Sequence, residues 1–338
     1  MFKDLLRYPI IQAPMAGGAS TPMLAASVSN AGGLGFLAAG YKTAKEMEGE
    51  IAQTRQMTKR PFGVNVFVPG HEVVDESSLS AYHEKIEKEA KSVGVAIGNA
   101  HSDDDDWQNK LAALKEARMA IVSFTFGCPS SDVISELQSV GTLIAVTVTN
   151  LQEAKKAAGA GADVLCVQGI EAGGHRASFE NRTEDDYGLL VLIRMIENEL
   201  KLPIIAAGGL MHGKDIAAVL AAGATAAQLG TAFLRCPESG ASPVHKEALG
   251  NPRFTRTSVT RAFSGRRARG LVNHFLTEYD SVAPVAYPYV HHMTKQMRKA
   301  AGQKNNPELM ALWAGQGFRL SRELPASELM ELLIEELK

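Results

Sequence analysis

A histidine that follows two glycines is the residue of this sequence best placed to do chemistry. The apolar run Val164–Gln168 leads within a few residues to Gly173, Gly174 and His175. An imidazole titrates near neutrality and can transfer a proton or bind an anion, while paired glycines let the backbone meet a planar ligand. The side-chain amide of Gln168 could bond the edge of a heterocycle. We therefore expect an acid–base histidine beside a flat ligand; a loop histidine bonded to a carboxylate is the alternative.

Two later apolar runs end in glycine-containing segments. Glycines at strand ends let backbone N–H groups approach phosphate oxygens closely. Together the two segments, one strand–helix unit apart, predict a phosphorylated ligand such as flavin mononucleotide (FMN). The alternative is tight turns that need glycine for a positive φ. The residues concerned are Gly208 and Gly209 in the first segment, and Gln228, Leu229, Gly230 and Thr231 in the second.

Two residues near other strand ends are further candidates. Met15, followed by Gly17 and Gly18, could let the chain pass flat against an aromatic ring, unless the glycines only form a turn before a helix. Asn65 is a polar residue inside an apolar run. Burying it without a partner would cost about 1–3 kcal/mol, so we expect a ligand or an interior partner for it.

Eight short apolar runs must position these residues. Each run is nearly continuous in apolar residues, which is typical of parallel strands covered on both faces. Six stretches between them have helical character, at 21–30, 43–57, 131–138, 151–159, 186–200 and 214–222. This alternation predicts a (β/α)8 TIM barrel rather than an open doubly wound sheet, whose glycine turn follows the first strand. The runs are 8–14, 34–39, 62–68, 120–126, 143–148, 164–168, 203–207 and 226–229.

The barrel is predicted to occupy residues 1–235, with an insertion at 69–118 after the third strand. Insertions at this face of a barrel commonly shape a substrate site. The insertion contains two helical segments and an acidic run, 103–106, which we interpret as a solvated charge cluster at a helix start rather than a metal site. Residues 236–338 are predicted to form a mostly helical substrate-cap region over the barrel mouth. No metal site is expected.

Composition and charge exclude several classes of protein. The chain has 338 residues, 45% of them hydrophobic, with 35 Lys+Arg against 37 Asp+Glu. This near balance provides no excess of positive charge of the kind that binds nucleic acid. The basic run 261–269 is interpreted as solvated or paired within the protein. No apolar stretch is long enough to cross a bilayer, and three scattered cysteines fit a reducing cytoplasm. We expect a cytoplasmic protein that binds neither nucleic acid nor membrane, and possibly forms a homo-oligomer.

Five motifs together resemble the nitronate monooxygenases (2-nitropropane dioxygenases), and more closely their first class. The resemblance covers nearly the whole chain and is specific as a combination. It implies a TIM barrel that binds FMN non-covalently. The motifs are PIIQAPMAGG at 9–18, NAGGLG at 30–35, EAGGHR at 171–176, QLGT at 228–231 and LWAGQ at 312–316.

The resemblance also implies an activity and roles for residues. Family chemistry is the oxidation of an alkyl nitronate with O₂, through an anionic semiquinone, to an aldehyde or oxo acid plus nitrite or nitrate. Propionate 3-nitronate is the expected substrate. His175 would be the active-site base or anion-binding residue, and in its protonated form it would stabilise the anionic nitronate electrostatically. Met15, Asn65, Gln168, Gly173, Gly209 and residues 228–231 would hold or adjoin the flavin.

The sequence departs from the family pattern at two positions. Thr125 stands where many relatives are expected to have a histidine, and His291 stands where some are expected to have a tyrosine. Tyr287, His291 and Lys295 recur at helical spacing, so one helix face could present Tyr287 and Lys295 to an anionic substrate, or could simply be solvated.

Two other functions stay open at this point. One is an FMN-dependent enoyl-acyl-carrier-protein reductase, which would need NAD(P)H. The other is a flavin- or phosphate-binding protein without turnover.

Overall fold

Eight parallel strands form a barrel in the computed structural model, which describes residues 2–70 and 73–338. The strand order is β1-β9-β8-β6-β5-β4-β3-β2, and a parallel bridge between Ile11 and Leu34 joins the first strand to the last. Each strand falls within one of the eight predicted runs, so the predicted barrel is confirmed. The strands are β1 (Ile10–Gln12), β2 (Gly35–Ala38), β3 (Phe62–Phe67), β4 (Ile121–Thr125), β5 (Leu143–Val148), β6 (Val164–Gln168), β8 (Ile204–Ala207) and β9 (Ala226–Leu229).

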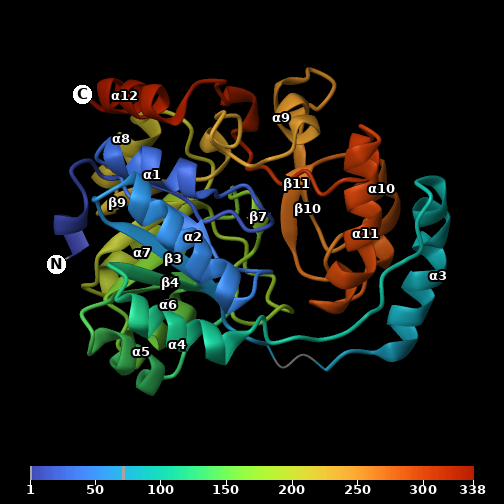
Figure 1. Ribbon diagram of the computed structural model, residues 1–338, viewed down its shortest axis with the longest axis horizontal. Helices are drawn as coiled ribbons and strands as arrows, with labels where there is room; N and C mark the ends of the chain where they lie inside the picture. Colours follow the sequence, from blue (N-terminus) through green and yellow to red (C-terminus); the bar gives the residue numbers. More distant parts are fainter. Residues whose placement is uncertain (1, 71–72) are drawn as a thin grey trace.

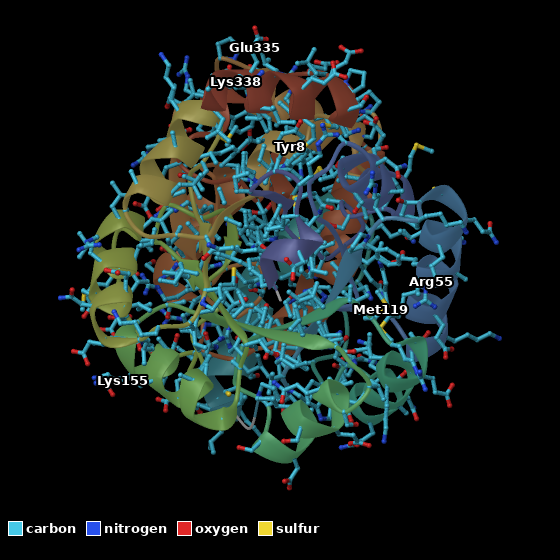
Figure 2. The ribbon with its side chains drawn as sticks, turned by 90° about the vertical axis from the view of Figure 1, so that its left-hand side faces the viewer. Tyr8, Arg55, Met119, Lys155, Glu335 and Lys338 are labelled. Atoms are coloured by element: carbon cyan, nitrogen blue, oxygen red, sulfur yellow. The ribbon has the colours of Figure 1, made fainter. Side chains whose placement is uncertain are left out.

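The barrel interior is filled by small and branched side chains. Ile11, Leu34 and Ile121 are buried there in one cluster with Phe2. Phe2 belongs to the short 3₁₀ helix η1 (Phe2–Leu5), which lies in the centre of the helix ring at the end of the barrel that faces the viewer in Figure 2. This end is therefore plugged, and only the opposite end, where the strands finish, is left for a site.

Eight helices surround the barrel, and the last of them comes from the end of the chain. Seven lie between strands of the barrel: α1 (Pro22–Asn30), α2 (Ala44–Met57), α4 (Trp107–Ala117), α5 (Ser131–Gln138), α6 (Leu151–Ala160), α7 (Leu189–Glu199) and α8 (Gly213–Ala221). The eighth is α12 (Ala326–Leu337), which packs between α8 and α1. Figure 2 shows the ring, with Arg55 on α2, Lys155 on α6 and Glu335 on α12 pointing outward.

Two helices therefore differ from the expected domain plan. We expected the whole of 236–338 to lie over the barrel mouth, but Leu329, Met330 and Leu333 of α12 are buried in the outer barrel core. This apolar face needs a partner, and the gap between α8 and α1 supplies one. Similarly, α4 packs on α2 and α5 as an ordinary barrel helix and does not belong to the insertion.

The helix starts are fixed by local capping. Thr43 accepts a hydrogen bond from the backbone N–H of Glu46, while the Glu46 carboxylate accepts one from the Thr43 N–H, which forms a capping box. The side chains of Thr21, Ser130 and Asn150 each accept a backbone N–H at the start of α1, α5 and α6. These residues hold the barrel helices in register with their strands.

A second layer covers the ends of the strands, to the right of the barrel in Figure 1. It contains an antiparallel sheet of β10 (Thr257–Thr260), β11 (Ala268–Leu271) and β7 (Gly174–His175), the last contributed by the loop after β6. The helices of this layer are α3 (Glu76–Ser92), α9 (Pro243–Gly250), α10 (His274–Tyr279) and α11 (Tyr289–Gln303), and α3 packs on α11. The sheet was not anticipated in a region expected to be mostly helical. Within the described residues, no helix is long and apolar enough to cross a membrane.

Candidate active site

His175 lies between the barrel and the second layer. It pairs with Ala268 in the antiparallel β7–β11 ladder, so the ladder fixes its backbone. Its ring contacts Phe126 and Tyr287, with centroids 5.8 Å away in both cases, and Trp313 at 5.4 Å. The histidine singled out from the sequence is therefore held in an aromatic box at the carboxyl ends of the strands.

The imidazole of His175 is neutral, contrary to our expectation of a pKa near neutrality and a protonated ring. Burial, together with the guanidinium groups of Arg266 and Arg298, lowers the pKa of His175 from 6.5 to about 3. These groups come from distant parts of the chain, which is why the sequence did not reveal the shift.

The hydroxyl of Ser264 determines which ring nitrogen carries the proton. Ser264 Oγ lies 3.1 Å from the carbonyl oxygen of Arg266, to which it can only donate, and 2.9 Å from His175 Nε2. With its single proton on the Arg266 carbonyl oxygen, the hydroxyl would accept from Nε2. The lone pair of Nδ1 is then available to accept a proton.

Gln168 anchors the loop that carries His175. Its Nε2 donates to the carbonyl oxygen of His175 at 3.0 Å, and its Oε1 accepts from Arg176 and from the N–H of Ala177, both at 3.0 Å. Its amide is thus engaged inside the protein. The structure gives Gln168 a positioning task where we had expected a contact with a heterocycle edge.

Asn65 has interior partners, one of the two possibilities expected for it. Its Nδ2 donates to Ser123 Oγ at 2.9 Å and to Thr125 Oγ1 at 3.0 Å. Thr125, the position where a histidine was expected in relatives, therefore bonds to a neighbouring strand.

Several of the predicted glycines are required by the backbone. Gly208 and Gly209 have φ values of +135° and +73°, which side chains rarely allow. A Cβ at Gly173 would lie 2.4 Å from the backbone nitrogen of Gly315. At these three positions the backbone conformation or the close packing is enough to explain why the residue is glycine, without a ligand.

Gly230 is different, because no strain or packing demands a glycine there. A Cβ at Gly230 would meet only Ala13 and Met15, at ordinary distances of 3.5 and 3.8 Å, and its φ is −105°. Within residues 2–70 and 73–338, the backbone N–H groups of Gly209 and Gly230 find no acceptor. Half-buried N–H groups without a protein acceptor fit a phosphate, so the strand ends suit the phosphate of an FMN molecule.

The remaining candidates near this cradle have distinct surroundings. Met15 is half-buried and faces Gly230. Thr231 Oγ1 accepts the N–H of Gly315 at 2.9 Å, and Gln228 donates to the Cys166 sulfur at 3.4 Å. Leu229 is buried in the outer barrel core, so its side chain points away from the cradle.

A cavity of about 690 Å³ adjoins the aromatic box. Phe126, Arg266 and Tyr287 line it, together with Tyr41. The hydroxyl of Tyr287 donates to that of Tyr41 at 3.1 Å, and burial raises the pKa of Tyr41 to about 12, so Tyr41 stays a phenol. The cavity thus offers a space for a small ligand within reach of the walls that enclose His175.

Lys295 is not brought to this cavity. Its side chain is exposed on α11, and Tyr287 precedes that helix, so the two do not share a helix face as the spacing suggested. His291 is buried and stacks on Tyr41, with ring centroids 4.1 Å apart, and its Nδ1 accepts from Arg298 at 3.2 Å.

Arg266 supplies the cation that the sequence analysis assigned to Lys295. Its guanidinium stacks over the Phe126 ring at 4.2 Å and donates to the carbonyl oxygens of Arg176 and Ser178. Only 3% of its surface is exposed. It belongs to the basic run 261–269, for which pairing within the protein, not solvation, is observed here. The signal in the sequence that could have indicated the burial of Arg266 is its position next to Ala268 and Arg269, which belong to β11, the middle strand of the small sheet.

The acidic run is only partly solvated. Asp105 pairs with Lys110 at 2.7 Å and accepts the N–H of Tyr41, and Asp106 accepts the N–H of Ala44. Burial raises the pKa of Asp105 from 3.8 to about 6. These two carboxylates hold the β2–α2 connection, and with it the position of Tyr41.

Comparisons with known proteins find relatives over nearly the whole length of the chain. The family model described as "Nitronate monooxygenase" matches residues 1–336. A nitronate monooxygenase of Pseudomonas aeruginosa is 43% identical, over 98% of this chain and 97% of its own. A probable nitronate monooxygenase of Bacillus subtilis is 39% identical, over 99% and 98%. Among solved structures, a nitroalkane oxidase from Streptomyces ansochromogenes is 51% identical with a TM-score of 0.97, covering 99% of this chain and 97% of that one. FabK from Thermotoga maritima is 28% identical with a TM-score of 0.78, covering 99% and 94%.

Proposed function

Since the chain belongs to the nitronate monooxygenase family, an enzyme family that oxidises nitronates, we propose that it uses FMN and O₂ to oxidise propionate 3-nitronate. The observation that carries the proposal is the placement of His175 in a box of Phe126, Tyr287 and Trp313 at the carboxyl ends of the barrel strands. When bound, FMN would accept electrons from the nitronate and pass them to O₂, which would leave a carbonyl product and nitrite or nitrate.

The cofactor would lie along the carboxyl ends of the strands. The N–H groups of Gly209 and Gly230 would bind its phosphate, and Met15 would lie near its ring. The second layer, including β7, β11 and α11, would close over the cofactor and substrate as a cap. This cap would limit access of water.

The substrate would enter from the cavity beside Tyr287. Its anionic groups would face the Arg266 guanidinium, which is the buried cation lining that space. The phenols of Tyr41 and Tyr287 would orient it by hydrogen bonds. His175 Nδ1 would accept a proton from carbon when a neutral nitroalkane is bound, because its lone pair is free while Nε2 is fixed on Ser264.

The test is oxygen consumption by the purified protein with propionate 3-nitronate, with and without NADPH, together with an absorbance spectrum. Oxygen uptake without NADPH by a yellow protein supports the proposal. Oxidation of NADPH with an enoyl thioester, without uptake on the nitronate, would assign the chain as a reductase. A protein that binds no flavin would contradict both.

The matched variants are His175→Asn and His83→Asn, the latter an exposed histidine on α3. His175→Asn should keep its flavin and lose about 100-fold or more of its turnover with a neutral nitroalkane, the substrate from which His175 is proposed to take a proton. His83→Asn should behave as the wild type. Wild-type turnover in His175→Asn would remove this residue from the mechanism.

A further inference from the structure

Two histidines and an aspartate converge at the rim of the cavity, outside the groups used above. His101 and Asp103 lie in the segment between α3 and α4, and His292 lies in the first turn of α11. One ligand atom from each of the three lies within 4.8 Å of the others. The rings of His101 and His292 stack with centroids 3.8 Å apart, and His292 Nε2 is 2.7 Å from Asp103 Oδ2.

The backbone fixes this convergence independently of the three side chains. The N–H of Gly98 donates to the carbonyl oxygen of Met293 at 3.0 Å. A Cβ at Gly98 would lie 2.3 Å from the carbonyl oxygen of His292, so only glycine allows the segment to approach α11 this closely. The segment is therefore docked on the helix just before His101.

From this geometry we propose that His101, Asp103 and His292 bind one divalent transition-metal ion of the zinc class. Two imidazole nitrogens and a carboxylate oxygen are a typical ligand set for Zn²⁺, Co²⁺ or Ni²⁺, with water completing the shell. His101 Nδ1 lies 3.0 Å from the carbonyl oxygen of Asn99, to which it donates, so Nε2 keeps a free lone pair for the metal.

Binding would require the stacked rings of His101 and His292 to tilt so that one nitrogen of each points to the ion. Tetrahedral bonds of about 2.0 Å place neighbouring ligand atoms about 3.3 Å apart. His292 Nε2 and Asp103 Oδ2 would separate slightly from their 2.7 Å contact, and the imidazole proton would move to Nδ1. Asp104 adds a second negative charge at the same rim.

A bound ion would link the inserted segment to α11 beside the cavity. Ser102, Asp103 and His292 all line that cavity, so the link would hold part of its rim in place. This role does not depend on the proposed oxidation, and it revises our expectation of no metal site.

The experiment is a titration of untagged, chelator-treated holoprotein with CoCl₂ and ZnCl₂, followed by calorimetry and by the visible absorbance of Co²⁺. One ion per chain with a dissociation constant in the micromolar range or below, weakened at least tenfold in both His101→Ala and Asp103→Asn, supports the site. His83→Ala is the control, because that histidine is exposed on α3 and should leave affinity unchanged. Both test side chains are exposed, so the variants should fold, and circular dichroism verifies this.

Three results would overturn the site. They are no binding up to 100-fold above the protein concentration, unchanged affinity in His101→Ala, and an equal loss in His83→Ala. The measurements use the metal alone, so a failure of the nitronate assay leaves them interpretable.

Discussion

The Nε2 atom of His175 and the hydroxyl oxygen of Ser264 lie 2.9 Å apart, and this contact orients the imidazole in the aromatic box. Ser264→Ala removes the acceptor and leaves a buried N–H unpaired, which costs about 1–3 kcal/mol. We expect kcat for a neutral nitroalkane to fall about tenfold, with flavin content retained and the melting temperature lowered by a few degrees. Ser258→Ala on β10 is the control. An unchanged kcat in Ser264→Ala would show that the tautomer does not matter.

The surroundings of Gly230 predict that the substitution Gly230→Ala selectively weakens the binding of flavin. In Gly230→Ala the new methyl group meets only Ala13 and Met15 at ordinary distances, so the fold should be retained. The methyl would occupy space proposed for the phosphate, and we expect flavin affinity, measured by fluorescence titration, to drop about tenfold or more. Gly159→Ala in α6 has open space around it and should bind flavin normally. Full flavin content in Gly230→Ala would place the phosphate elsewhere.

The buried guanidinium of Arg266 predicts a charge preference. Arg266→Met should lower kcat/KM for propionate 3-nitronate, which carries two negative charges, more than for ethyl nitronate, which carries one. We expect a difference of about tenfold between the two effects. The ratio is the appropriate readout, because lost contacts with Arg176 and Ser178 affect both substrates alike. Equal losses for the two nitronates would mean that Arg266 is only structural.

Buried neutral histidines predict a loss of stability in acid. Burial lowers the pKa of His245 from 6.5 to about 4, and burial also lowers the pKa of His291. Between pH 6.5 and about 4 these histidines are protonated in the unfolded chain but neutral in the folded one. The free energy of unfolding therefore decreases as the pH falls through this range, by up to about 1.4 kcal/mol per pH unit for each histidine.

The measurement is the melting temperature of the wild type and of His245→Gln from pH 7.5 to 4.5. Glutamine can keep the hydrogen bond to the carbonyl oxygen of Trp313 but takes up no proton. The variant should therefore lose less stability in acid than the wild type. His83→Gln serves as the control, and parallel curves for wild type and His245→Gln would contradict the prediction.

The buried ion pair of Lys110 and Asp105 predicts a large stability effect near the cavity. Only 1% of the Lys110 side chain is exposed, and it lies 2.7 Å from Asp105. Lys110→Met leaves a buried carboxylate, so urea unfolding at pH 7.5 should show a loss of about 3–5 kcal/mol. The exposed pair Lys115–Glu136 provides the control, since Lys115→Met should cost less than about 1 kcal/mol. A similar loss in both variants would contradict the prediction.

The sequence by itself determined the barrel and which candidate residues lie at the ends of its strands. Strand runs and glycine turns are local patterns, because burial on both faces of a parallel sheet and positive φ values each restrict residue type at the position concerned. His175 could be identified because it follows a strand end, and strand ends of a parallel barrel meet at one face.

Only the tertiary structure decided how the site is charged and enclosed. The neutral state of His175 depends on Arg266 and Arg298, which come from remote segments, and burial and Coulomb interactions depend on distance in space. For the same reason the sequence favoured Lys295 over Arg266, although the former is exposed and the latter is buried against Phe126. The position of α12 as the eighth barrel helix likewise depended on the gap between α8 and α1, which exists only once the barrel has closed.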